Sequence, residues 1–195
     1  MTIQEALIYA THELSGIEGH SKIIYSLLSY VLCLPDTHLW AHPDTIIVQQ
    51  QFTRFDALVQ RAKNHEPLAY LLGTASFYDL DFKVTQDTLI PRPETEDLVQ
   101  WIIDDLKAAD GDRMNILDIG TGSGCIALSL AKVFPGARVT AIDISEEALK
   151  VAKGNADLNQ TEVNFVQEDV LGLGSLPEKF DIIVSNPPYV RELEK

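Results

Sequence analysis

The stretch Met114-Asn-Ile-Leu-Asp-Ile-Gly-Thr-Gly-Ser-Gly124 places a run of mostly apolar residues directly before a turn that contains three glycines. The run predicts a strand over 114–119, and apolar residues at helical spacing then predict a helix over 123–133. Glycines at a strand-to-helix turn let the backbone approach a ligand that a Cβ atom would exclude. This unit therefore predicts an α/β sheet with a ligand site at its edge.

The residues that follow repeat the alternation of strand and helix. We expect, in chain order, a strand over 138–142, a helix over 146–158, and strands over 163–167 and 180–184. Such alternation predicts a doubly wound parallel sheet. The last strand is apolar enough to be buried on both faces, and Pro187-Pro188 end it because proline neither donates to a sheet nor continues a helix.

The N-terminal third of the chain predicts a small helical bundle. Thr2-x-x-Glu5 is a capping box, and apolar residues at helical spacing follow it and start again after Ser21. Residues 75–84 then alternate bulky and polar side chains, as the two strands of a β-hairpin do. We therefore expect a helical domain over 1–73, a hairpin linker over 74–89 and an α/β domain over 90–195.

Composition limits the classes of function. The 195 residues carry 29 acidic and 15 basic side chains, a net charge of −14, which disfavours nucleic-acid binding because such binding depends on lysine and arginine. No apolar run approaches the roughly 20 residues of a membrane span, and the N-terminus lacks the basic flank of a signal peptide, so we expect a cytoplasmic protein that does not contact a membrane. Cys33 and Cys125 lack metal-ligand spacing and are expected to be reduced, small core residues.

The spacing of the glycines indicates the kind of ligand. A dinucleotide fingerprint requires glycine where this chain has Cys125, and a phosphate-binding loop requires a lysine that is absent. Asp143, at the end of the second strand, is placed to accept hydrogen bonds from ribose hydroxyls, and Glu168-Asp169, after the third, to reach an adenine amino group. A nucleoside without a phosphate points to S-adenosylmethionine.

The turn Ser185-Asn-Pro-Pro-Tyr189 follows the last predicted strand. Asn186 offers an acceptor oxygen and a donor nitrogen, Pro187 a backbone carbonyl, and Tyr189 a flat ring with a hydroxyl. Together these groups suit a planar NH2 group.

These motifs, together with Glu66-Pro-Leu-Ala-Tyr-Leu-Leu-Gly73 and Leu89-Ile-Pro-Arg-Pro-Glu-Thr-Glu96, closely resemble the HemK/PrmC family of protein-(glutamine-N5) methyltransferases. The resemblance covers nearly the whole chain and implies a Rossmann-like class I S-adenosylmethionine-dependent methyltransferase domain. It implies N5-methylation of the glutamine in the Gly-Gly-Gln motif of class-I peptide chain release factors, with S-adenosylhomocysteine as the second product. Residues 90–96 would form part of the wall of the active site.

The same resemblance implies the site residues. Cofactor-binding residues would be Gly120, Thr121, Gly122, Ser123, Gly124, Asp143, Asp169, Val170 and Asn186. Substrate-binding residues would be Asn186, Pro187, Pro188 and Tyr189, with Asn186, Pro187 and Tyr189 catalytic. Val170 stands where the family often has an aromatic residue, so aliphatic packing would hold the adenine.

The proposed chemistry depends on orientation. The Asn186 oxygen and the Pro187 carbonyl would accept hydrogen bonds from the two N–H groups of the target amide, while the Tyr189 ring packs on the plane of that amide. Such positioning can lower a barrier by roughly 7–11 kcal/mol.

Two alternatives remain: an N6-adenine or other exocyclic-amine nucleic-acid methyltransferase, which the acidic charge disfavours, and a non-catalytic binding module. Family members continue beyond this turn, so we expect the four predicted strands to be part of a seven-stranded sheet and the chain to be a fragment of a longer protein, with strand 180–184 at an uncovered edge.

Overall fold

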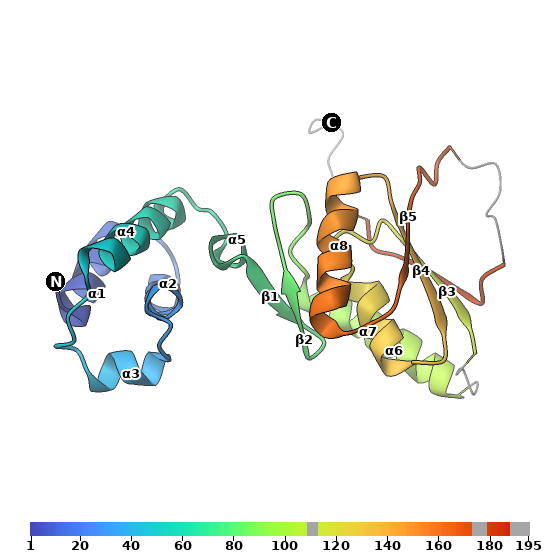
Figure 1. The fold of residues 1–195 in the computed structure, drawn as a ribbon, viewed down its shortest axis with the longest axis horizontal. Helices are drawn as coiled ribbons and strands as arrows, with labels where there is room; N and C mark the ends of the chain where they lie inside the picture. The colour runs from blue at the N-terminus through green and yellow to red at the C-terminus, as the bar shows by residue number, and fades with distance from the viewer. Residues whose placement is uncertain (109–112, 173–178, 188–195) are drawn as a thin grey trace. The chain divides into compact units, whose positions relative to one another are not determined.

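The computed structural model describes residues 1–108, 113–172 and 179–187, which belong to two compact units, 1–72 and 73–195 (Figure 1). Each unit has its own hydrophobic core. The boundary at residue 73 groups the β-hairpin with the second unit, whereas the sequence predicted a separate linker.

Five helices make up the first unit: α1 (Ile3–Glu13), α2 (His20–Leu32), α3 (Asp36–Ala41), α4 (Gln49–Lys63) and α5 (Leu68–Leu72). The predicted capping box is present, because the Thr2 hydroxyl accepts from the Glu5 N–H and the Glu5 carboxylate accepts from the Thr2 N–H. Helix α3 was not predicted, since its six residues are too few to establish a period.

The core of the first unit is entirely apolar. Phe55 of α4 and Leu27 and Leu28 of α2 are fully buried in it. All residues of this unit are described, and every buried one among them has an apolar side chain. Burial of this kind stabilises by about 25 cal/mol per Å² of apolar surface. Packing of helix faces therefore holds this unit together.

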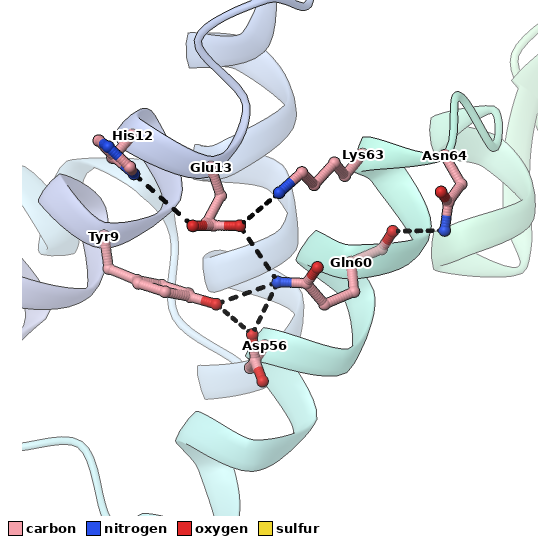
Figure 2. A network of polar contacts seen from close by, with 7 residues as sticks. All are labelled: Tyr9, His12, Glu13, Asp56, Gln60, Lys63 and Asn64. Atoms are coloured by element: carbon pink, nitrogen blue, oxygen red, sulfur yellow. Dashed lines mark hydrogen bonds and ion pairs between the residues drawn. The ribbon is translucent and has the colours of Figure 1, made fainter.

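A network of polar contacts joins α1 and α4 of the first unit outside its apolar core (Figure 2). The Tyr9 hydroxyl donates to Asp56, and this hydrogen bond is the main reason why the pKa of Tyr9 is raised. The Gln60 amide nitrogen lies 3.1 Å from the Tyr9 oxygen and 3.5 Å from the Glu13 carboxylate, which also pairs with Lys63 at 2.9 Å. These residues join the two helices outside the core.

The second unit begins with the predicted hairpin, β1 (Thr74–Phe77) paired antiparallel with β2 (Leu80–Lys83). Its turn residues Tyr78 and Asp79 both have positive φ, 47° and 60°, as a type I′ turn requires. The Tyr78 N–H donates to Glu96 Oε1 at 3.0 Å and its hydroxyl to Gln100 Oε1 at 2.7 Å. Both acceptors lie on helix α6 (Pro93–Ala108), so the turn is bonded to that helix.

The described sheet has four parallel strands in the order β5-β4-β3-β6. They are β3 (Asn115–Ile119), β4 (Arg138–Asp143), β5 (Asn164–Gln167) and β6 (Ile182–Ser185), connected in part by α7 (Cys125–Val133) and α8 (Glu146–Asn159). The predicted doubly wound parallel sheet is confirmed over these residues.

The register of the sheet determines which side chains share a face. Asp118 is level with Ala141 and Val184, and all three lie on the face that packs in one core with α6 and α7. Ile183 points to the opposite face and is 53% exposed. The prediction that 180–184 is buried on both faces is therefore wrong, because β6 is the edge strand of the described sheet and only one of its faces is covered by described residues.

The cysteines differ from each other. Cys33 is exposed at the C-terminus of α2, in a left-handed conformation with φ 55°, so the prediction that it is a core residue is wrong. Cys125 is half-buried beside the core, and burial raises the pKa of its thiol to about 12.

None of the helices in the described part of the chain has the length and apolar character needed to cross a membrane.

Candidate active site

The carboxyl ends of the four strands meet at one edge of the sheet. Ile119 of β3 is level with Ile142 of β4 and with Ser185 of β6. A predicted site residue stands at the end of each strand there: Glu168 after β5, Asp143 as the last residue of β4, Gly120 after β3 and Asn186 after β6. Ligands of doubly wound sheets bind at this edge, so the structure brings the predicted site residues after different strands together.

The glycine loop, residues 120–124, is open beside two of its glycines. Gly120 and Gly122 have φ of 71° and 55°, and a Cβ atom on either would meet no atom within 4 Å. The N–H groups of Gly120 and Thr121 both donate to the carbonyl of Ile142, which holds the loop against the end of β4. The loop therefore offers backbone and free space to a ligand.

Asp143 fastens this loop to the next turn. Its Oδ2 accepts from the Gly122 N–H at 2.9 Å, and its Oδ1 accepts from the Ser145 N–H at 3.0 Å. Ser145 in turn caps helix α8. Each carboxylate oxygen can accept more than one hydrogen bond, so Asp143 keeps acceptor capacity for a hydroxyl of a ligand.

Asp118 lies buried behind the loop, with 1% of its surface exposed. Its Oδ2 accepts from the Thr121 hydroxyl at 2.6 Å, whereas its Oδ1 has no hydrogen-bond partner among the described residues. Burial raises the pKa of this carboxyl to about 6, against the lowering effects of the Thr121 hydroxyl and the Ala127 N–H, and the charge of Asp143 raises it further. Burying a carboxylate oxygen without a hydrogen-bond partner costs free energy, so Asp118 is an unusual polar residue to find behind the loop.

The remaining loop residues face the protein. Thr121 is buried on Asp118, and the Ser123 carbonyl accepts from the Asn155 side chain. At Gly124, with φ 84°, a Cβ atom would lie 3.2 Å from the Ala152 Cβ. These contacts give Thr121, Ser123 and Gly124 structural roles, and their contact with a cofactor stays a prediction.

The Asn186 turn is bonded to the first turn of α6. The Ser185 hydroxyl donates to the Ile119 carbonyl at 2.8 Å, and the Asn186 Nδ2 donates to Thr95 Oγ1 at 2.9 Å. Thr95 is 6% exposed and lies in the segment 90–96 that was expected to line the site. Its individual role was not predicted, because a hydroxyl in the first turn of a helix is ordinarily a cap.

The other predicted residues are placed as follows. The Glu168 N–H donates to the Asp143 carbonyl at 3.1 Å, and the exposed Asp169 accepts from the Leu171 N–H at 3.0 Å. Val170 is half-buried and Pro187 is exposed. Pro188 and Tyr189 lie outside the described residues, so the roles predicted for them stay predictions.

This strand order, with a glycine loop after the first strand and an acidic residue at the end of the second, is that of a Rossmann-like sheet, and the family match over residues 98–195 identifies it as a class I S-adenosylmethionine-dependent methyltransferase fold. Residues 98–195 match the family described as "Methyltransferase small domain", and residues 5–73 match "PrmC N-terminal domain". The chain belongs to the release factor glutamine methyltransferase family.

Relatives support this membership over most of the chain. The release factor glutamine methyltransferase of Flavobacterium psychrophilum is 46% identical over 175 residues, which are 89% of this chain and 61% of that protein. That of Koribacter versatilis is 39% identical over 196 residues, 100% of this chain and 69% of that protein. The chain thus spans about three fifths to two thirds of the length of these relatives. A methyltransferase structure from Agrobacterium tumefaciens aligns at 26% identity, with a TM-score of 0.48, over 59% of this chain and 39% of its own.

Proposed function

We propose that this chain carries the methyl-transfer site of a cytoplasmic enzyme that methylates N5 of the glutamine in the Gly-Gly-Gln motif of class-I release factors. The observation that carries the proposal is the hydrogen bond from Asn186 Nδ2 to Thr95, because it leaves the amide oxygen of Asn186 as the acceptor for a substrate N–H. The names of the relatives support the choice of substrate.

The proposed cofactor fits the groups along the sheet edge. S-adenosylmethionine, when bound, supplies an electrophilic methyl group on a sulfonium. The open side of Gly120 and Gly122 would lie beside its amino-acid part, and the free oxygen of Asp118 would face a positive charge. Asp143 would accept from the ribose hydroxyls with its remaining lone pairs.

Asn186 and Pro187 would orient the acceptor. An amide nitrogen is a poor nucleophile because its lone pair is delocalised into the carbonyl. If the Asn186 oxygen and the Pro187 carbonyl accept hydrogen bonds from both N–H groups of the target amide, its nitrogen is held in line with the methyl group. Such positioning lowers the activation barrier by roughly 7–11 kcal/mol. No residue of the chain is needed as a base, since the methylated amide nitrogen loses its proton readily.

A protein substrate agrees better with the charge than a nucleic acid does. The net charge of −14 opposes a polyanion, so we propose that the chain makes no direct contact with nucleic acid. Transfer of methyl groups to adenine in DNA or RNA, at a rate comparable with transfer to a release factor, would contradict this proposal.

The test separates cofactor binding from transfer. We expect S-adenosylhomocysteine to bind in titration calorimetry and the binding to be lost in Asp143→Ala. Asn186→Ala should abolish methyl transfer to a release factor while leaving cofactor affinity within about a factor of two, since a residue that acts mainly on the acceptor lowers turnover more than binding. Comparable losses of affinity and transfer in Asn186→Ala would refute the assigned role.

A matched pair of variants tests the orientation of Asn186. Thr95→Val keeps the shape but removes the hydroxyl, so the Asn186 amide loses its partner; Thr95→Ser keeps the hydroxyl. We expect transfer to fall about tenfold in Thr95→Val, the effect of one lost hydrogen bond of ~1.4 kcal/mol, and to remain in Thr95→Ser. Equal activity of the two variants would argue against orientation by Thr95.

A further inference from the structure

Helix α8 contains a buried asparagine that the chemistry above does not use. Asn155 has 0% of its surface exposed, in the interior of a helix, where asparagine is a poor helix former. Burying an amide costs free energy unless its donors and acceptor are bonded. Its hydrogen bonds therefore explain why the position is polar.

Three hydrogen bonds fix the orientation of this side chain. The Asn155 Nδ2 donates to the Ser123 carbonyl at 2.9 Å and to the Lys83 carbonyl at 3.0 Å, and its Oδ1 accepts from the Lys83 N–H at 2.7 Å. The reverse orientation would set the amide oxygen against two carbonyl oxygens. One side chain thus joins the glycine loop to strand β2 of the hairpin.

The close packing of α8 on the loop makes this reach possible. A Cβ atom on Gly124 would lie 3.2 Å from the Cβ of Ala152, which is one turn before Asn155. A glycine and an alanine at the contact let the helix approach the loop closely. The short side chain of Asn155 then spans the distance to the Ser123 carbonyl.

The same hairpin is bonded to the acceptor half of the site. At its turn, the Tyr78 N–H donates to Glu96, and the neighbouring Thr95 accepts from Asn186. The hairpin therefore contacts the first turn of α6 at one point and, through Asn155, the glycine loop at another. It connects the two halves of the candidate site.

We propose that Asn155 is a positioning residue that holds the glycine loop to the β1–β2 hairpin, so that the cofactor side and the acceptor side keep a constant separation. The part of this inference that concerns the cofactor rests on the proposed function. The alternative is that Asn155 only stabilises the fold, as any buried bonded residue does.

Asn159 provides a matched control. It lies one turn further along α8, and its Nδ2 donates to the Asp81 carbonyl of the same strand β2 at 2.8 Å. The Asn159 Nδ2 also donates to the Asn155 carbonyl at 2.9 Å, so these two hydrogen bonds fasten α8 to the hairpin and not to the glycine loop. Asn159→Ala therefore removes a hydrogen bond between the same helix and the same strand, at a less buried position, without touching the loop.

The first test is amide hydrogen exchange of residues 120–124, which requires no cofactor. Exchange should rise about tenfold or more in Asn155→Ala, because the Ser123 carbonyl loses its partner, and stay within about a factor of two of wild type in Asn159→Ala. Equal increases in the two variants, or no increase in Asn155→Ala, would overturn the proposal. If Asn155→Ala does not fold, Asn155→Ser keeps one donor and should give an intermediate increase, whereas unchanged exchange there would overturn it.

The second test is titration of each variant with S-adenosylhomocysteine. Asn155→Ala should bind about tenfold more weakly than wild type and Asn159→Ala about as tightly, at matched fractions of folded protein. Equal affinities in the two variants would overturn the cofactor part of the proposal. Failure of the wild-type chain to bind would instead contradict the proposed function, and the exchange comparison would still decide whether Asn155 holds the loop.

Discussion

The two units of the chain differ in where they place polar side chains. In residues 1–72 every buried residue is apolar, and the polar contacts of Tyr9, Asp56 and Gln60 lie at the surface. In the described part of the second unit, polar residues are buried as well: Thr88, Thr95, Asp118, Thr121, Ser123, Ser129, Thr140 and Asn155. Most of these lie in or are bonded to the candidate site.

This difference shows that apolar burial alone can hold a unit together, whereas the buried polar residues of the second unit shape the candidate site. Burying polar groups costs free energy, so a fold that needs only stability has little reason to do it. The second unit buries a carboxylate at Asp118 and an amide at Asn155 beside the glycine loop, and it satisfies almost every polar atom of these two side chains. The exception is Asp118 Oδ1, which is buried without a hydrogen-bond partner among the described residues.

The largest expected effect is in the apolar core of the first unit. Phe55→Ala should lower the free energy of unfolding of the helical unit by about 3–5 kcal/mol, because Phe55 is fully buried. Ile8→Ala, at a residue that is 63% exposed, serves as the control and should change it little. Chemical denaturation followed by circular dichroism measures both. Loss of cofactor affinity in Phe55→Ala in proportion to the loss of stability would show that the two cores are not independent.

Gly124→Ala should destabilise the second unit almost as strongly. The left-handed backbone at φ 84° costs about 1–2 kcal/mol with a Cβ atom, and contacts of 3.2 Å with Ala152 and Leu128 add about 1–3 kcal/mol of overpacking. Gly120→Ala is the matched control, since φ is 71° there but no atom lies within 4 Å. In thermal unfolding without cofactor, the midpoint temperature of Gly124→Ala should be lower than that of Gly120→Ala. Equal losses would mean that close packing of α8 is not required.

Asp118 predicts a dependence of stability on pH. Its pKa is about 6 in the folded chain against 3.8 for the free group, so the folded state binds more protons between these values. The free energy of unfolding that Asp118 contributes should therefore fall by about 3 kcal/mol as the pH rises from about 4 to about 6. Asp118→Asn removes this titration, so the variant should gain stability relative to wild type over that interval in urea unfolding. If the difference in free energy of unfolding between the two proteins stays constant from about pH 4 to about pH 6, the pKa of Asp118 is not raised by folding.

The smallest effect belongs to the surface contacts of the first unit. Tyr9→Phe removes the hydroxyl that donates to Asp56 and should cost about 1 kcal/mol, the net contribution of a single hydrogen bond that is only partly buried. Urea denaturation, compared with Phe55→Ala, gives the ratio of the two effects. A loss as large as that of Phe55→Ala would remove the distinction between surface and core drawn above.

The sequence by itself determined the kinds of element and the place of the site. Periodicity and caps are local properties, so the capping box at Thr2, the hairpin and the strand-helix alternation from 114 onward were all predicted. The carboxyl ends of parallel strands meet at one edge, so the positions of Gly120, Asp143 and Asn186 after their strands were sufficient to place them together.

Only the tertiary structure decided which groups touch across the chain. The bond between Asn186 and Thr95 joins residues 91 positions apart, and Asn155 bonds Lys83 across 72. Exposure of Cys33 and of Ile183 likewise depends on what packs beside them. Local patterns record the periods of helices and strands, whereas hydrogen bonds between distant segments and the covering of a sheet face arise only when the elements pack in three dimensions.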